Sequence, residues 1–268
     1  MRFTRLTVDS PLPYTGGHVH AFVVHGAVPT LIDAPTDHPD FLARLEAALA
    51  AAGDGPLQQL FATHAHPDHV AGAAAVAARW PDARRLKRLW PARDTLSQVT
   101  WEAIDGEPML PAGDTRLWAL ATPGHAPDHT CFFDVTAGVM FAGDLVINGG
   151  SVTIPASAGG SLTAYLRSLR SVLELQPRRM LPSHGPEVDQ PASLLRGYIA
   201  HRMQRERQVL ELLTAGIASP DVMVDRLYAS VEPSLKRAAR ENVLAHLAKL
   251  EEDGRVRQGD DGWTLLAR

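Results

Sequence analysis

Three histidines and one aspartate lie within six consecutive positions of this sequence: His64, His66, Asp68 and His69. His64 and His66 stand two residues apart, so in an extended segment both imidazoles point to the same side and can share one ion. Pro67 interrupts the extended run and can turn Asp68 and His69 toward a second ion. Imidazole and carboxylate are the ligands of zinc and of harder first-row divalent cations. This segment therefore predicts a metal site.

Two ions need more ligands than four residues provide, and the chain offers three more at the ends of expected strands: His125, Asp144 and His184. Pro123 and Gly124 shape a turn that exposes the imidazole of His125. The carboxylate of Asp144 can bridge two cations. Each of these residues alone would be a weak signal, but together with the first cluster they complete the ligands of two ions.

The elements that must position these residues alternate between strand and helix patterns through the first half of the chain. Each polar cluster follows the end of an expected strand, which is where layered α/β folds place ligands. Strands are expected over residues 19–24, 28–33, 57–63, 115–121, 130–135, 139–141 and 178–181, and helices over residues 37–53, 70–80 and 161–175. The first domain is therefore predicted to be of the α/β class.

The pattern of expected secondary structure changes near residue 191. A long helix is expected over residues 194–215, followed by helices over 220–229 and 234–253 and a hairpin over 254–268. Helices followed by a terminal hairpin outline a winged helix. We therefore expect two domains, residues 1–190 and residues 191–268.

The composition excludes several classes of protein. The chain has 268 residues, 12 histidines, one cysteine and a formal net charge of −4. One cysteine permits neither an intramolecular disulfide framework nor a thiolate zinc cluster. Residues 1–10 reach an acid before any apolar stretch, and the apolar run over 71–78 is far shorter than the roughly 20 residues of a membrane span. A cytoplasmic protein without a membrane partner is expected.

The ordered set His64-x-His66-x-Asp68-His69, His125, Asp144 and His184 resembles the metallo-β-lactamase-fold hydrolases. The resemblance implies a four-layer αββα sandwich with two divalent metal ions at one edge, zinc first and manganese or iron as alternatives. It assigns the first metal to His64, His66 and His125, the second to Asp68, His69 and His184, and the bridge between them to Asp144.

The resemblance also implies a chemistry. A hydroxide held between two such cations attacks a carbonyl or phosphoryl centre, so no serine or cysteine nucleophile is required. Asp68 is the expected catalytic residue, both a ligand and the hydrogen-bond partner of the hydroxide. The absence of a cysteine ligand argues against the thiolate-containing antibiotic-degrading β-lactamases. Only 40 positions separate Asp144 from His184, which leaves no room for the extra domain of the β-CASP nucleic-acid-processing relatives.

A narrower resemblance is to the branch called β-lactamase-like protein 2, which has a C-terminal winged-helix domain. It rests on residues 165–169, 181–186 and 198–206. Members of that branch include thioesterases that release acyl chains from carriers and endonucleases of single-stranded RNA. His20 stands where relatives commonly place Asn, and residues 158–160 replace a more acidic loop, so the substrate preference stays open.

The favoured function is a dinuclear metal-dependent hydrolase of an ester, thioester or related acyl bond, with a small-molecule or acyl substrate. The first alternative is hydrolysis of single-stranded RNA. The second is a nucleic-acid-binding module with a vestigial metal site, but no expected ligand is missing. Residues 196–268 carry 12 Lys and Arg against 11 Asp and Glu, a balance that disfavours duplex DNA as a partner. A homodimer is left open.

Several residues near the expected site favour structural roles. His20 and Tyr165 are expected to pack, and His201 is expected to pack between domains, with anchoring of a substrate anion as its alternative. Asp33 is expected to hydrogen-bond a ligand rather than to be one. Cys131 is expected to be a buried thiol without chemistry.

Overall fold

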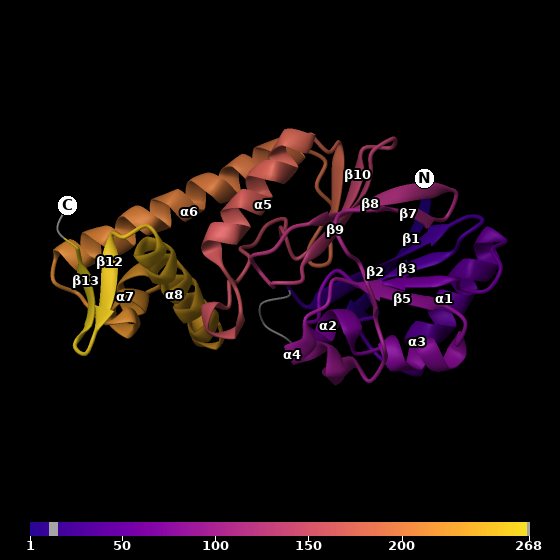
Figure 1. Cartoon of the computed structure of the whole chain (residues 1–268), viewed down its shortest axis with the longest axis horizontal. Coiled ribbons are helices and arrows are strands. Elements are labelled where there is room, and N and C mark those ends of the chain that lie inside the picture. The colour runs from indigo at the N-terminus through magenta and orange to yellow at the C-terminus, as the bar shows by residue number, and fades with distance from the viewer. Residues whose placement is uncertain (11–15, 267–268) are drawn as a thin grey trace.

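The first of two large sheets comes from the N-terminal part of the chain. The computed structural model describes residues 1–10 and 16–266 (Figure 1). The first sheet has six strands in chain order: β1 (Arg2–Asp9), β2 (His18–His25), β3 (Thr30–Ile32), β4 (Gln59–Phe61), β5 (Arg84–Lys87) and β6 (Glu102–Ala103). β1, β2 and β3 pair antiparallel, and from β3 to β6 the pairing is parallel.

The second sheet has five strands in the order β11-β10-β9-β8-β7. Its strands are β7 (Met109–Ala112), β8 (Thr115–Ala121), β9 (Thr130–Asp134), β10 (Val139–Gly143) and β11 (Arg179–Pro182). Only the β10–β11 pair is parallel among these. The connection between those two strands passes through a long loop and helix α5 (Leu162–Leu175), as a parallel pair requires.

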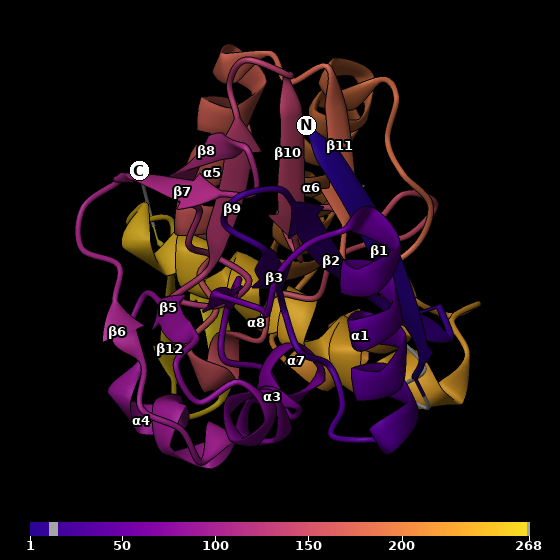
Figure 2. The ribbon, with the colours of Figure 1, turned by 90° about the vertical axis from the view of Figure 1, so that its right-hand side faces the viewer.

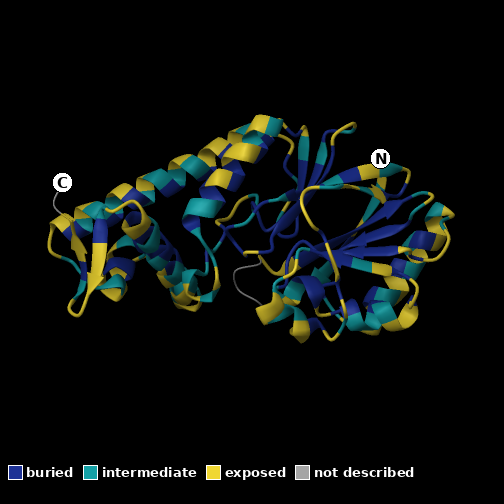
Figure 3. Ribbon diagram, viewed as in Figure 1, coloured by how far each residue is buried: buried dark blue, intermediate teal, exposed yellow. Residues whose placement is uncertain are grey.

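Helices cover both outer faces of the paired sheets (Figure 2). α1 (Pro39–Ala52) and α3 (Ala73–Arg79) cover the first sheet, and α5 covers the second together with the start of α6 (Pro191–Thr214). Alternate strand residues serve different layers: Phe132 packs between the sheets, whereas its neighbours Cys131 and Phe133 face α5. The expected four-layer αββα sandwich is confirmed, and its strands are the most deeply buried part of the molecule (Figure 3).

The C-terminal part forms the expected winged helix. It contains α7 (Pro220–Leu227), α8 (Lys236–Glu252), β12 (Val256–Gly259) and β13 (Gly262–Leu265), while residues 267–268 of the expected hairpin lie outside the described residues. Helix α6 belongs to both cores, because Leu195 packs with α5 and Leu213 packs with α7 and α8. Among the described residues, no helix is both long and apolar enough to cross a membrane.

The helix predicted over residues 70–80 has the wrong bounds. The segment predicted as a single helix over 70–80 forms two, α2 (Pro67–Val70) and α3, separated at Gly72. The backbone of Thr36 crosses here, and a Cβ at Gly72 would lie 2.1 Å from its carbonyl oxygen. The start at Pro67 places Asp68 and His69 in the first turn of α2. The sequence patterns also missed β1, β5, β6, β7 and the short helix α4 (Pro91–Asp94).

Candidate metal centre

The seven predicted residues come from four connections that meet at one edge of the sandwich. His64, His66, Asp68 and His69 follow β4, His125 lies between β8 and β9, Asp144 follows β10, and His184 follows β11. Their side-chain donor atoms form three groups, in each of which the ligand atoms lie within 4.8 Å of one another. These groups are His64, His66 and His125; His64, His69 and Asp144; and Asp68, His69 and His184.

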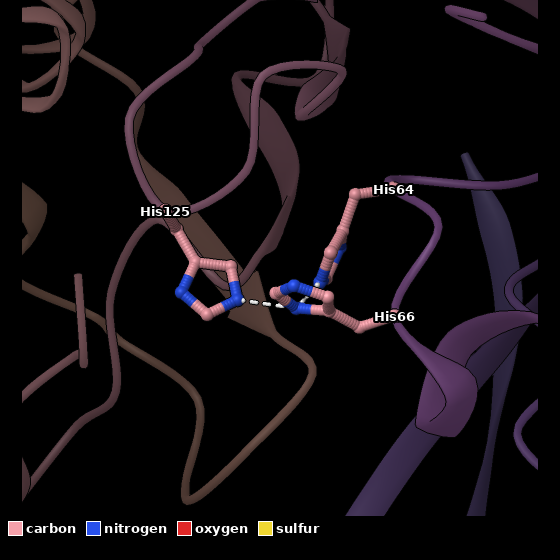
Figure 4. Close-up of side chains that lie close together, drawn as sticks. All are labelled: His64, His66 and His125. Atoms are coloured by element: carbon pink, nitrogen blue, oxygen red, sulfur yellow. Dashed lines mark hydrogen bonds between the residues drawn. The ribbon is translucent and has the colours of Figure 1, made fainter. Parts of the chain in front are cut away.

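The first group is a convergence of three imidazoles (Figure 4). His66 Nδ1 lies 2.9 Å from His64 Nε2 and 2.8 Å from His125 Nε2. A ring nitrogen carries at most one proton, so it cannot hydrogen-bond fully with two such neighbours at once. Three nitrogens aimed at one point are the arrangement that a cation satisfies.

The second group brings carboxylates to two further imidazoles. His184 Nε2 lies 3.4 Å from Asp68 Oδ2 and 3.4 Å from Asp144 Oδ1. Asp144 faces both groups, because its Oδ1 is 3.6 Å from His69 Nε2 and its Oδ2 is 3.3 Å from His125 Nε2. The carboxylate of Asp144 therefore lies between the two sets of imidazoles.

Most of these imidazoles are held by the nitrogen that faces away from the centre. His125 Nδ1 donates to Thr153 O at 2.7 Å, and His184 Nδ1 donates to His18 O at 2.8 Å. His64 Nδ1 bonds the Thr63 hydroxyl at 3.0 Å. Such bonds fix the tautomer, so that Nε2 presents its lone pair to the centre.

His69 is held by a carboxylate, Asp33, as the sequence predicted. His69 Nδ1 donates to Asp33 Oδ2 at 2.8 Å, and Asp33 also accepts from the Thr63 amide and hydroxyl. Asp33 has a φ of 63°, a left-handed backbone conformation that Asp and Asn tolerate better than other residues with side chains. The turn after β3 thereby aims this carboxylate at His69.

His129 and Thr153 support the ligands. The spacing of four residues from His125 predicts that His129 is a strand residue near the ligands, and the structure places it just before β9. The Asp144 amide donates to His129 Nε2 at 2.9 Å, and His129 Nδ1 bonds the Thr122 hydroxyl at 2.8 Å. His129 thus orients the segment that carries Asp144. No sequence signal indicates Thr153, because any residue type can supply its backbone carbonyl.

Burial and charge set the protonation of the site. Burial, reinforced by the charges of neighbouring histidines, lowers the pKa of His64 well below its ordinary value and that of His66 to about 3. Burial opposes ionisation of Asp144, but the positive charges of His184 and His69 lower its pKa well below the ordinary value. Neutral His64 and His66 and ionised Asp144 are in the protonation states in which these groups bind divalent cations.

The donor set fits a divalent metal. Two buried atoms among the donors, His69 Nε2 and Asp144 Oδ1, have no hydrogen-bond partner among the described residues. Orphaned polar atoms of this kind carry a free-energy cost unless something charged satisfies them. Nitrogen and carboxylate oxygen suit zinc, manganese or iron. Ligation by the seven residues stays a prediction.

Of the other residues discussed from the sequence, His20, Tyr165 and Cys131 are packed in the fold, whereas the role of His201 stays a prediction. His20 bonds Thr7 Oγ1 at 3.1 Å and Gly185 O at 3.1 Å, which supports the turn that carries His184. Tyr165 is fully buried, and its hydroxyl donates to Leu145 O. His201 is half-buried on α6. Cys131 is buried, as expected, and burial raises the pKa of its thiol to about 12.

The profile of the "Metallo-beta-lactamase superfamily" matches residues 14–184, a span that contains all seven residues. The chain belongs to this superfamily. It is therefore a hydrolase of the metallo-beta-lactamase superfamily. The fold of this superfamily implies divalent metal ions, and the chain has His and Asp groups that could bind them. The "Beta-lactamase associated winged helix domain" matches residues 219–263, in agreement with the observed C-terminal fold.

Two curated relatives cover most of the chain. A "Beta-lactamase-like protein 2 homolog" of Caenorhabditis elegans is 28% identical over 260 residues, which are 94% of this chain and 85% of that protein. An "Atrochrysone carboxyl ACP thioesterase" of Cryptosporiopsis sp. (strain 8999) is 28% identical over 286 residues, 99% of this chain and 85% of that protein. The narrower resemblance to the β-lactamase-like protein 2 branch is confirmed.

Two solved structures have a fold similar to that of this chain. A metallo-beta-lactamase family protein of Thermus thermophilus superposes with a TM-score of 0.80 at 21% identity, covering 98% of each chain. Another protein, crystallised in a di-iron-bound form, superposes with a TM-score of 0.57 at 28% identity, over 71% of this chain and 96% of that one. The first likeness extends the shared fold through the winged helix.

Proposed function

We propose that the chain is a dinuclear metal-dependent hydrolase that cleaves a thioester, ester or related acyl bond. The observation that carries this proposal is the position of Asp144, whose two oxygens face separate groups of imidazoles at 3.3 and 3.6 Å. A carboxylate shared between two ligand groups suits a pair of cations better than a single one. A related protein in a di-iron-bound form supports the same stoichiometry.

The proposed ligands divide as the family resemblance assigns them. His64, His66 and His125 hold the first metal, Asp68, His69 and His184 hold the second, and Asp144 bridges. Zinc is the metal that we propose, with manganese or iron able to use the same nitrogen and oxygen donors. We further propose that residues 1–190 form the catalytic domain and residues 191–268 the winged-helix domain.

Two bound cations supply an activated water and polarise the carbonyl oxygen of the substrate. The chain's own residues orient these partners. Asp68 has the more exposed of the two carboxylates, at 16% of its side chain against 10% for Asp144. We assign to Asp68 the hydrogen bond that orients the attacking water, with His184 Nε2, 3.4 Å from its Oδ2, fixing that carboxylate.

An acyl substrate is favoured over RNA because three of the chain's cationic side chains, Lys87, Arg202 and Arg205, are engaged inside the protein. Lys87 is buried and pairs with Asp94 at 2.6 Å and with Asp128 at 2.9 Å. Arg202 is 1% exposed, and Arg205 stacks on Tyr228 with its guanidinium 4.4 Å from the ring centroid. These three side chains make contacts inside the protein, whereas an RNA-binding groove exposes its Lys and Arg side chains to the phosphates. The thioesterase name of a relative of 28% identity supports the same choice.

The test is a substrate panel run on protein reconstituted with zinc, manganese or iron. Acyl-thioesters, esters and lactones are compared with labelled single-stranded RNA, for the wild type and for Asp144→Ala. Asp189→Ala removes an exposed carboxylate and is the matched control. We expect metal-dependent acyl hydrolysis that only Asp144→Ala abolishes.

The other outcomes separate the alternatives. Turnover of RNA but of no acyl substrate would favour the endonuclease. Full activity without metal would contradict both enzymatic functions. Tight duplex-DNA binding that survives raised salt, without any hydrolysis, would instead identify a binding module with a vestigial site.

A further inference from the structure

The loop between β10 and α5 carries the carbonyl that holds His125. His125 Nδ1 donates to Thr153 O at 2.7 Å. The amide of the next residue, Ile154, donates to Asn242 Oδ1 on α8 at 3.0 Å. The carbonyl of Thr153 and the amide of Ile154 belong to one peptide group, which is planar and rigid. One peptide plane therefore joins the winged-helix residue Asn242 to the imidazole of His125.

Asn242 is itself firmly placed. It is buried, and its Oδ1 also lies 3.3 Å from Arg202 Nη1. The Arg202 guanidinium lies 5.4 Å from the Tyr165 ring centroid, and its Nη2 donates to Val152 O. Residues on both sides of Thr153 are thus fixed by side chains from α6 and α8.

A second pair of hydrogen bonds to α8 holds the same loop at Ser157. The Ser157 amide donates to Glu241 Oε2 at 2.9 Å and its hydroxyl to Glu241 Oε1 at 2.8 Å. The side chains of Val152 and Ile154 also pack in the core beneath α5. The core therefore anchors the loop, while the polar contacts to α8 set the direction of its peptide planes.

We propose that Asn242 is a positioning residue for the metal centre, which acts on His125 through the Thr153–Ile154 peptide. The acceptor Oδ1 sets the tilt of that peptide plane, and the hydrogen bond to its amide polarises its carbonyl, which strengthens the bond to His125 Nδ1. That bond fixes the tautomer in which Nε2 faces His66. The inference rests on the proposed function only in giving His125 the role of a ligand.

The test compares Asn242→Leu, which keeps the volume but lacks the acceptor, with Asn242→Asp, which retains it. Met223→Ala is the control, because Met223 is fully buried in the winged-helix core on α7, away from the loop. All variants are first checked for folding by circular dichroism and thermal unfolding. Glu241→Ala, which removes only the tie to Ser157, serves as the milder variant should Asn242→Leu not fold.

The first readout is made on metal-free protein. The His125 Nδ1 proton is followed by NMR with 15N-labelled histidine, and its exchange with solvent is expected to be about tenfold faster in Asn242→Leu and near wild type in Asn242→Asp. The second readout is metal affinity by chelator competition, with about a tenfold loss in Asn242→Leu, the lower end for residues that support a ligand. Unchanged proton exchange and affinity in Asn242→Leu, or equal losses in Met223→Ala, would overturn the inference.

The two proposals fail in distinguishable ways. If the wild type binds no metal, the proposed function is lost, whereas the proton-exchange readout still reports whether Asn242 positions His125. If metal binds and supports hydrolysis but Asn242→Leu behaves as wild type, the proposed function stands and the role of Asn242 is lost.

Discussion

Two buried histidines, His69 in one domain and His246 in the other, have opposite electrostatic surroundings. In the metallo-beta-lactamase sandwich, His69 is fully buried, yet Asp33 holds its Nδ1 and two further carboxylates face its Nε2. In the winged helix, His246 is equally buried, but neither of its ring nitrogens has a hydrogen-bond partner among the described residues. Cationic groups surround it, among them Arg202 and Arg205.

This difference in neighbouring charges shifts the pKa values of His69 and His246 in opposite directions. Burial alone favours the neutral imidazole, and at His246 it lowers the pKa to about 3 with help from the positive charges of Arg202 and Arg205. At His69 burial acts the same way, but the charges of Asp33 and Asp144 outweigh it and raise the pKa well above the ordinary value. The field at His69 therefore favours a positive charge, whereas the field at His246 excludes one.

The largest effect is expected from Asp144→Ala, which removes the carboxylate between the two groups. Hydrolysis should fall by more than about a hundredfold, since loss of a residue that merely supports a ligand costs about 10–100-fold. Metal content by mass spectrometry should drop as well. His246→Leu is the control from the other domain and should keep both metal and rate. A fully loaded, active Asp144→Ala protein would break the contrast between the domains.

Metal removal should destabilise the fold next most strongly. Ligand at a hundred times its dissociation constant stabilises the native state by about 2.7 kcal/mol. Zinc added to metal-free wild type at a hundred times its dissociation constant should therefore raise the free energy of unfolding by about this amount for each occupied site, measured by urea titration. His246→Leu should show the same gain and Asp144→Ala little. An identical gain in Asp144→Ala would place the bound metal elsewhere.

The third prediction concerns His246 and pH. In the unfolded chain this imidazole binds a proton below about 6.5, but burial in the fold keeps its pKa near 3. The contribution of neutral His246 to the free energy of unfolding is thus complete above pH 6.5 and is lost as the pH falls toward 3. At pH 5 the loss amounts to about 2 kcal/mol. His246→Leu should lose less stability than wild type between pH 7.5 and pH 5 in urea unfolding. Parallel losses in the two proteins would contradict this assignment.

The smallest effect is expected from Asp33→Asn, which weakens the support of His69. Asn tolerates the φ of 63° at this position, so the backbone should persist. Its amide cannot match the carboxylate in accepting from His69 Nδ1 and from Thr63, and we expect about a tenfold loss of metal affinity. Chelator competition measures this, with Asp189→Ala as the surface control. Wild-type affinity would show that His69 needs no anionic partner.

Much of the fold was predictable because its patterns are local. The amphipathic helix at α5 and the turn at Gly53, whose φ is 72°, follow from side-chain spacing and glycine alone. The break at Gly72 was not predictable, because it arises from the close approach of Thr36, a contact distant in sequence. Strand β1 was missed since its pairing with β2, rather than its own residues, defines it.

The donor types, their order and the family can be read from the residues alone, because metal ligation demands imidazole and carboxylate side chains that few other residues can replace. The direction in which each donor points depends on the tertiary structure. His125 and His184 are oriented by the carbonyls of Thr153 and His18, and a backbone carbonyl is the same in every residue type. Which carbonyl lies opposite which imidazole depends on chain crossings that bring together residues up to 166 positions apart.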